Sequence, residues 1–182
     1  MKKEKFLKEL FIGISLGMVS LLFVINCDNN QEPILEDEKV KVLKVIDGDS
    51  LLVLKDGKEI EIRLKGIDAP EIGQAYGERA KQYVENVLNF KKEIRLELFD
   101  EYSYDRQIGK VYYHGFFGTE RDLSEVLLSV GLAWHYIKYS NNLDYAEHEY
   151  YAKNQKKGVW SEPNPLAPWN FRKYNSCVLN RK

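Results

Sequence analysis

The sequence predicts a small α+β domain in which five short strands form a barrel and about three helices pack around it. Three observations predict this fold. Three alternating apolar segments follow one another with Asp-Gly pairs between them, a segment with helical spacing comes next, and two more alternating segments follow that helix. Five strands with a helix between the third and the fourth are typical of a small Greek-key barrel of the OB type.

The first three strands are predicted over residues 40–46, 51–54 and 60–64. Asp47-Gly48 and Asp56-Gly57 separate them, and Asp-Gly is a strong signal for a type I′ hairpin turn, which needs positive φ at both central residues. Residues 39–65 are therefore expected to form a three-stranded meander.

The remaining elements follow from periodicity and from capping residues. Helices are expected over 77–89, 119–130 and 142–157, and strands over 93–99 and 108–113. Thr119 is expected to cap the second helix, with Asp122 in its first turn. The segment 160–169 holds three prolines, so we expect it to be extended.

The chain of 182 residues has room for one domain and an export segment. Residues 1–26 run from a basic stretch into an apolar stretch, as in a secretory signal peptide, and Cys27 follows as a candidate lipidated residue. We expect a polar tether at 27–38, the domain at 39–170 and a tail at 171–182. An uncleaved signal anchor and a secreted form are the alternatives to a lipoprotein facing the periplasm or cell surface.

Composition limits the classes of function. With 44% hydrophobic residues, 30% charged residues and a net charge of -1, the chain is expected to have a packed core and no overall positive field that would attract polyanions. Cys27 and Cys177 are its two cysteines, so a disulfide framework and a zinc cluster are not expected.

The meander brings acidic residues to one edge of the sheet. The third strand ends at the edge where the first turn lies, so four acids become neighbours there: Asp47, Asp49, Asp68 and Glu71. Carboxylates at this density repel one another unless a cation neutralises them, and hard oxygen ligands suit Ca²⁺ or Mg²⁺. The alternative is that they are ordinary turn residues, which applies most to Asp47 because it lies in the turn.

Two arginines are candidates for binding a phosphate. With a two-residue turn at Asp56-Gly57, Ser50 pairs with Arg63, which places Arg63 beside Asp49, whereas a slip of one residue would turn it to the other face. A guanidinium stays charged and binds phosphate through two hydrogen bonds. Arg106, on its residue type and position alone, would be an ordinary solvated loop residue.

Several segments together resemble the signature of the staphylococcal nuclease (thermonuclease) family. They are Val45-Ile46-Asp47-Gly48-Asp49-Ser50, Ile62-Arg63-Leu64-Lys65-Gly66-Ile67-Asp68-Ala69-Pro70-Glu71, Tyr104-Asp105-Arg106, Val130-Gly131-Leu132-Ala133 and Gly158-Val159-Trp160. The resemblance covers residues 39–169.

The resemblance implies an OB-type barrel with a Ca²⁺ site, Mg²⁺ or Mn²⁺ being alternative ions. The ligands would be Asp49, Asp68 and the backbone carbonyl of Ala69, with Asp47 supporting the site without necessarily touching the ion. Glu71 would be the general base that activates water.

The resemblance also implies the substrate and its contacts. Arg63 and Arg106 would hold and stabilise the phosphoryl group, and Tyr104 and Tyr139 would contact the nucleotide. The expected protein is a monomeric endonuclease that cleaves phosphodiester bonds of DNA, RNA or both and leaves 3′-phosphate products.

Two departures from the family pattern predict weaker anion binding. Asp105 stands where the family usually has Gly and is expected to compete for Arg106 or to distort the turn, and Ser103 replaces a lysine. An alternative function is a weak or inactive domain that only binds nucleic acid or protein on a surface lipoprotein, although the five residues that carry the chemistry are present. No catalytic role is expected for the three histidines, which are His114, His135 and His148.

Overall fold

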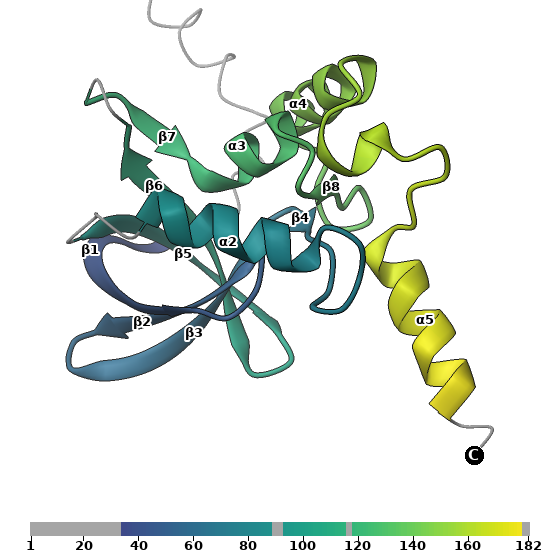
Figure 1. Ribbon diagram of the computed structural model, residues 1–182. Coiled ribbons are helices and arrows are strands. Elements are labelled where there is room, and N and C mark those ends of the chain that lie inside the picture. Colours follow the sequence, from purple (N-terminus) through teal and green to yellow (C-terminus); the bar gives the residue numbers. More distant parts are fainter. Residues whose placement is uncertain (1–33, 89–92, 116–117, 180–182) are drawn as a thin grey trace, which may run out of the picture. The chain divides into compact units, whose positions relative to one another are not determined.

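The computed structural model describes residues 34–88, 93–115 and 118–179 (Figure 1). The expected export segment and Cys27 lie outside these residues, as do residues 27–33 of the expected tether. Within the part of the chain that the structure describes, no helix combines the length and hydropathy needed to cross a bilayer.

Five strands close into a barrel, which confirms the predicted fold class. They are β1 (Ile34–Val45), β2 (Ser50–Lys55), β3 (Lys58–Leu64), β5 (Ile94–Ser103) and β6 (Arg106–His114). The sheet runs in the order β3-β2-β1-β5-β6, and a parallel pairing between β3 and β6 closes it. The barrel is filled by completely buried apolar side chains such as Leu51, Ile62 and Leu96.

The two Asp-Gly pairs form different connections. Asp56 and Gly57 have φ values of 48° and 75°, as a type I′ turn requires, which confirms the prediction for that hairpin. The prediction of a type I′ turn at Asp47-Gly48 is wrong, because neither Asp47 nor Gly48 has a positive φ. Gly48 serves packing instead, since a Cβ there would lie 2.7 Å from the Cβ of Ala69.

Four α-helices are found among the described residues: α2 (Gly77–Leu88), α3 (Leu123–Ser129), α4 (Leu143–Asn154) and α5 (Pro168–Leu179); a short 3-10 helix, η1 (Gly158–Ser161), lies between the last two. The first three correspond to the predicted helices, and α5 was not predicted. It starts within the segment expected to be extended and continues into the expected tail. Proline at the first position of a helix is favourable because its missing N–H has no helical partner there.

The start of α3 differs from the prediction. Thr119 does not cap it, because residues Glu120–Asp122 form a short strand, β7, which pairs with β6. Asp122 is the cap: its carboxylate accepts a hydrogen bond from the backbone N–H of Ser124 at 2.7 Å. The other oxygen of Asp122 accepts the hydroxyl of Tyr145 at 2.7 Å, which ties α3 to α4.

Two short elements position the loop that carries the remaining acids. β4 (Ile67–Asp68) pairs with β8 (Trp134–His135), and Asp68 lies opposite Trp134 in this ladder. The ladder fixes the backbone at Asp68 just after the barrel strand β3 ends. The side chain of Asp68 is therefore buried beside the barrel rather than exposed in a mobile loop.

Candidate active site

The pairing of β2 with β3 places the first arginine. Ser50 is paired with Arg63, which confirms the predicted register. The backbone N–H of Leu64 donates to the carbonyl of Asp49 at 2.8 Å, so the residue before Ser50 is also held against β3. The predicted neighbours Asp49 and Arg63 are therefore in contact.

Arg63 joins two buried carboxylates from different segments. Its Nη1 donates to Asp49 Oδ1, and its Nη2 donates to Asp68 Oδ1 at 2.6 Å. The side chains of Asp49 and Asp68 are 2% and 0% exposed, and that of Arg63 is 12% exposed. The backbone N–H of Ala69 donates to the second oxygen of Asp49 at 2.5 Å. The arrangement is a buried network in which one cation serves two anions.

The electrostatics of this network favour a further positive charge. Burial raises the pKa of Asp49 to about 7, although Arg63 acts to lower it, and the neighbouring Asp47 and Asp68 raise it further. For Arg63, burial acts to lower the pKa, but Asp49 and Asp68 outweigh it and the pKa is raised. Because Asp49 is harder to ionise than an ordinary aspartate, a further cation close to it would stabilise its charged form.

Asp47 lies at the edge of this network. Its Oδ1 accepts the backbone N–H of Asp49 at 3.0 Å, a local turn that fixes the loop between β1 and β2. Its side chain lines the same pocket as Arg63. Asp47 therefore holds the backbone of Asp49 and lies close enough to raise the pKa of the Asp49 carboxyl.

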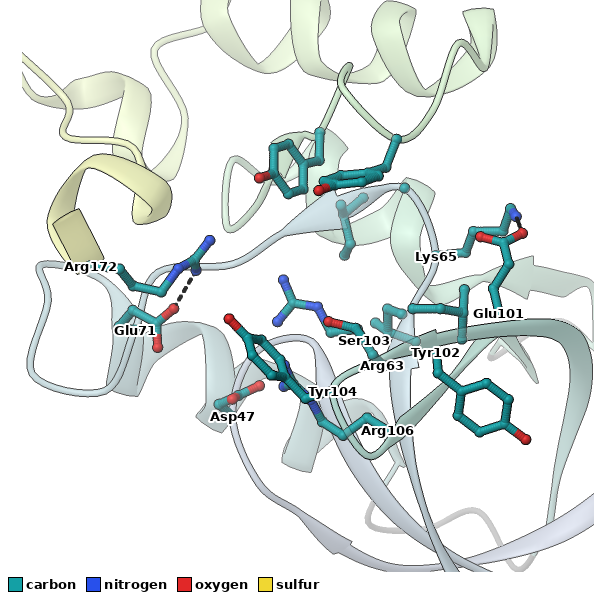
Figure 2. Close-up of a pocket in the computed structure, with 16 residues that line it drawn as sticks. Asp47, Arg63, Lys65, Glu71, Glu101, Tyr102, Ser103, Tyr104, Arg106 and Arg172 are labelled. Atoms are coloured by element: carbon teal, nitrogen blue, oxygen red, sulfur yellow. Dashed lines mark hydrogen bonds and ion pairs between the residues drawn. The ribbon is translucent and has the colours of Figure 1, made fainter.

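Glu71 follows Pro70 and points into the pocket. The backbone N–H of Glu71 donates to the side chain of Gln74 at 3.1 Å, and its carboxylate is one-third exposed. That carboxylate accepts Nη1 of Arg172 at 2.5 Å (Figure 2). The same guanidinium donates to both oxygens of Asp68, at 3.1 Å and 2.8 Å.

Arg172 was not found by sequence reasoning. It lies on α5, in a segment expected to be a tail, where a lone arginine is usually solvated. The hydrogen bonds to Asp68 and Glu71 raise its pKa further above its usual range, while its partial burial acts against this. A signal for the helix existed in Pro168, but nothing in the sequence shows that this helix returns to the acidic edge.

Arg106 lies on the opposite side of the pocket from Glu71 in the view of Figure 2. Its Nη1 donates to the hydroxyl of Ser50 at 2.8 Å, and its Nε lies 3.8 Å from Glu61. Among the described residues, Arg106 pairs with these two side chains rather than with its neighbour Asp105. The expected competition by Asp105 is therefore not found in this arrangement.

Aromatic side chains surround the pocket, which has a volume of about 470 Å³. Tyr104 is 93% exposed and Tyr139 is 62% exposed, and both line it. Tyr104 has φ of 57°, which costs a side chain of this size about 1–3 kcal/mol. Tyr136 also lines the pocket, and its ring stacks on that of Trp169. The structure therefore holds flat, exposed rings at the entrance.

The expected metal ligands fit a hard cation by their chemistry. Asp49, Asp68 and the carbonyl of Ala69 provide oxygen donors, as Ca²⁺ and Mg²⁺ prefer. Among the described residues, no group of three or more His, Cys, Asp or Glu side chains is arranged to hold a metal. A set of two carboxylates and one carbonyl contains fewer such side chains, so this finding does not conflict with the expected ligands.

The three histidines lie outside this cluster. His135 is buried and its Nε2 lies 3.2 Å from the hydroxyl of Ser140. His148 lies 3.8 Å from Glu125, between α3 and α4. None of the three lines the pocket.

The fold and the site define a class of protein. It is an OB-type barrel with a pocket lined by Arg63, Arg106 and aromatic rings, and the buried carboxylates of Asp49 and Asp68 lie beside this pocket in contact with Arg63. Carboxylates that fit a divalent cation beside arginines are the groups that metal-assisted phosphate-ester chemistry requires.

Comparison with known proteins identifies the family. Residues 61–162 match the family model described as staphylococcal nuclease homologue. The chain is 34% identical to a protein named micrococcal nuclease from Shigella flexneri, over 81% of this chain and 88% of that protein. It is 32% identical to an uncharacterized endonuclease from Haemophilus influenzae, over 76% of this chain and 75% of that protein. The chain belongs to the staphylococcal nuclease family.

Proposed function

We propose that this protein is a metal-dependent nuclease that hydrolyses phosphodiester bonds of DNA, RNA or both. The observation that carries this proposal is the network in which Arg63 holds Asp49 and Asp68 together at a pocket that also contains Glu71 and Arg106. The names of the relatives from Shigella flexneri and Haemophilus influenzae support a nuclease.

In this proposal, Asp49, Asp68 and the carbonyl of Ala69 hold the metal, with Ca²⁺ as the expected ion. When bound, the metal offsets phosphate charge and helps to orient water. Asp47 fixes the loop that carries Asp49, through the hydrogen bond described above. Glu71 accepts the proton of the attacking water, which is worth about 10²–10⁴-fold in rate for a general base.

The arginines and tyrosines bind the substrate. Arg106 faces the pocket from β6 and stabilises the phosphoryl oxygens as negative charge develops there. Arg63 has five N–H donors, so its contacts with two carboxylates do not exhaust it, and it also contributes to phosphate binding. The exposed rings of Tyr104 and Tyr139 stack against bases or the sugar. The water oxygen forms a bond to phosphorus and the bond between phosphorus and the 5′-oxygen breaks. The 5′-oxygen takes up a proton from solvent and leaves as a hydroxyl, and the other product carries a 3′-phosphate.

A cleavage assay tests this function. The purified protein is incubated with single-stranded DNA and with RNA in the presence of Ca²⁺, Mg²⁺ or Mn²⁺, and again with a chelator. Cleavage is expected with Ca²⁺ and is expected to stop with chelator. Absence of cleavage with every ion would reject the enzyme and favour a binding domain.

Glu71→Gln separates this mechanism from a contaminating activity. The substitution keeps the size of the side chain and removes the proton acceptor, so the rate is expected to fall by about 10²–10⁴-fold. Cleavage that persists in Glu71→Gln with chelator present would show that the activity does not use this site. The 3′-phosphate is checked by treating the products with a 3′-phosphatase and measuring the shift in mobility.

A further inference from the structure

Arg172 contacts the two acids that the proposed function needs most. Its Nη2 lies 2.8 Å from Asp68 Oδ2, and its Nη1 lies 2.5 Å from Glu71 Oε1. Asp68 is a proposed metal ligand, and Glu71 is the proposed base. Figure 2 shows Arg172 facing Glu71 across the edge of the pocket, with a dashed line between them. One guanidinium thus covers both groups.

These contacts and the proposed chemistry exclude each other. Both oxygens of Asp68 accept hydrogen bonds from Arg172, and a divalent cation held by those oxygens would lie close to a guanidinium of the same sign. The Glu71 oxygen Oε1 already accepts a hydrogen bond from Arg172, so Arg172 occupies the place where an attacking water would donate to this oxygen. Arg172 therefore has to leave Asp68 and Glu71 before the site works as proposed.

Arg172, rather than Arg63, is the arginine that is able to leave. Arg63 also contacts Asp68, but its side chain is 12% exposed and it lies in a barrel strand paired on both sides. The side chain of Arg172 is 43% exposed, and the following residues of α5 up to Cys177 are exposed as well. Withdrawal of the Arg172 side chain alone uncovers little apolar surface, because this side chain is already partly exposed, whereas withdrawal of Arg63 would open the barrel edge.

Trp169 links the position of Arg172 to the pocket. It lies one turn earlier on α5, and its ring stacks on that of Tyr136 with 5.2 Å between centroids and an interplanar angle of 8°. Tyr136 lines the pocket that Arg172 also lines. A change in how α5 docks therefore changes the surroundings of an indole, which is a natural fluorescent reporter.

We propose that Arg172 is an internal competitor for the metal site: its guanidinium occupies Asp68 and Glu71 when no metal is bound, and it withdraws and loosens the docking of α5 when a divalent cation binds. This inference rests on the proposed function, because it uses the proposed roles of Asp68 and Glu71. In this proposal, metal binding and the release of Arg172 are linked equilibria, so Glu71 is free to act as the base only when the metal is bound.

Metal affinity tests the competition directly. Ca²⁺ binding to the full-length protein is measured by titration calorimetry for wild type, Arg172→Ala and Arg172→Gln. If Arg172 is docked about 90% of the time, its removal tightens the apparent Kd about tenfold. Lys173→Ala is the matched control: it removes the same charge from the next residue of the same helix, which is exposed, and is expected to leave the Kd unchanged.

A second measurement follows α5 without using activity. Hydrogen exchange of residues 168–177 and the emission of the tryptophans are recorded with and without Ca²⁺. In wild type, Ca²⁺ is expected to speed exchange in this segment and to shift the emission. In Arg172→Ala the segment is expected to exchange fast already and to respond little. Circular dichroism and thermal melting verify that Arg172→Ala, Arg172→Gln and Lys173→Ala fold.

The outcomes separate the inference from the proposed function. Equal Ca²⁺ affinity in wild type and Arg172→Ala, or weaker affinity in the variant, overturns the competition while leaving the nuclease intact. Failure of every variant, including those without Arg172, to bind Ca²⁺, Mg²⁺ or Mn²⁺ rejects the metal-dependent function and the inference with it. Tighter binding in Arg172→Ala and Arg172→Gln but not in Lys173→Ala supports the inference.

Discussion

Arg63 and Arg106 are expected to have the same function, but their surroundings differ. Arg63 is almost buried and is the counter-ion of two buried carboxylates. Arg106 is more exposed. It donates to the hydroxyl of Ser50, and its Nε lies 3.8 Å from the carboxylate of Glu61. Removal of one partner from a buried charge network leaves the other charge uncompensated, whereas a partly exposed pair contributes little to stability. Of these two arginines, Arg63 is therefore the one that stabilises the fold.

Alanine substitutions at these positions separate structure from catalysis. Arg63→Ala is expected to lower the free energy of unfolding by about 3–5 kcal/mol, because the buried Asp49 loses its guanidinium partner and Asp68 keeps only its pairing with Arg172. Arg106→Ala is expected to change it by no more than about 1 kcal/mol. Both are expected to lower cleavage strongly. Urea unfolding followed by circular dichroism, together with the cleavage assay, measures the two effects, and equal stability losses would contradict the assignment.

The conformation of Tyr104 lowers stability, whereas its exposed ring is proposed to bind the substrate. Its positive φ is costly for a tyrosine and easy for glycine. Tyr104→Gly is expected to leave stability unchanged or raise it by up to about 1 kcal/mol, since relief of strain opposes the added chain entropy. It is also expected to raise the KM for single-stranded DNA, because a base loses its stacking partner. Tyr104→Phe, which keeps the ring, is the control and is expected to behave like wild type in KM.

At the scale of elements, alternation and turn residues predicted the three-stranded meander correctly. They did not predict the start of α3, which depends on strand pairing between segments that are not adjacent in sequence. The Asp56-Gly57 turn fixed the register that sets Arg63 beside Asp49, so this half of the site was predictable. The start of α3 was not, because Thr119 and Asp122 are both good caps. The pairing of β7 with β6 places residues 120–122 in a strand, so the helix starts after Asp122, and the sequence pattern does not predict this pairing.

Alanine substitutions at Thr119, the predicted cap of α3, and at Asp122, the observed cap, are expected to differ in their effect on stability. Asp122→Ala removes the cap and leaves the buried hydroxyl of Tyr145 without its acceptor, at a cost of about 2–4 kcal/mol in the free energy of unfolding. Thr119→Ala changes an exposed side chain and is expected to cost less than about 0.5 kcal/mol. Thermal and urea unfolding measure both. A larger loss for Thr119→Ala would show that the helix starts earlier in solution.

For the whole molecule, the site is assembled from segments that are far apart in the sequence. Asp49, Arg63 and Asp68 come together through strand pairing, which alternation and turn chemistry predict. Arg172 arrives from a helix near the end of the chain, more than a hundred residues from Asp68. Its position depends on the packing of Trp169 on Tyr136 and on no local pattern, so sequence reasoning found the acids and missed the arginine that covers them.

The location of the molecule is a further prediction. We propose that residues 1–26 direct export and that a lipid on Cys27 holds the domain at a membrane, facing the periplasm or cell surface. Cys27→Ala is then expected to move the protein from the membrane fraction to the soluble fraction, because lipidation supplies the anchor. Cys177→Ala is the matched control, since this cysteine is exposed on α5 and its loss is expected to leave the distribution unchanged. Retention of Cys27→Ala in membranes after an alkaline carbonate wash would argue that residues 1–26 remain as a spanning anchor.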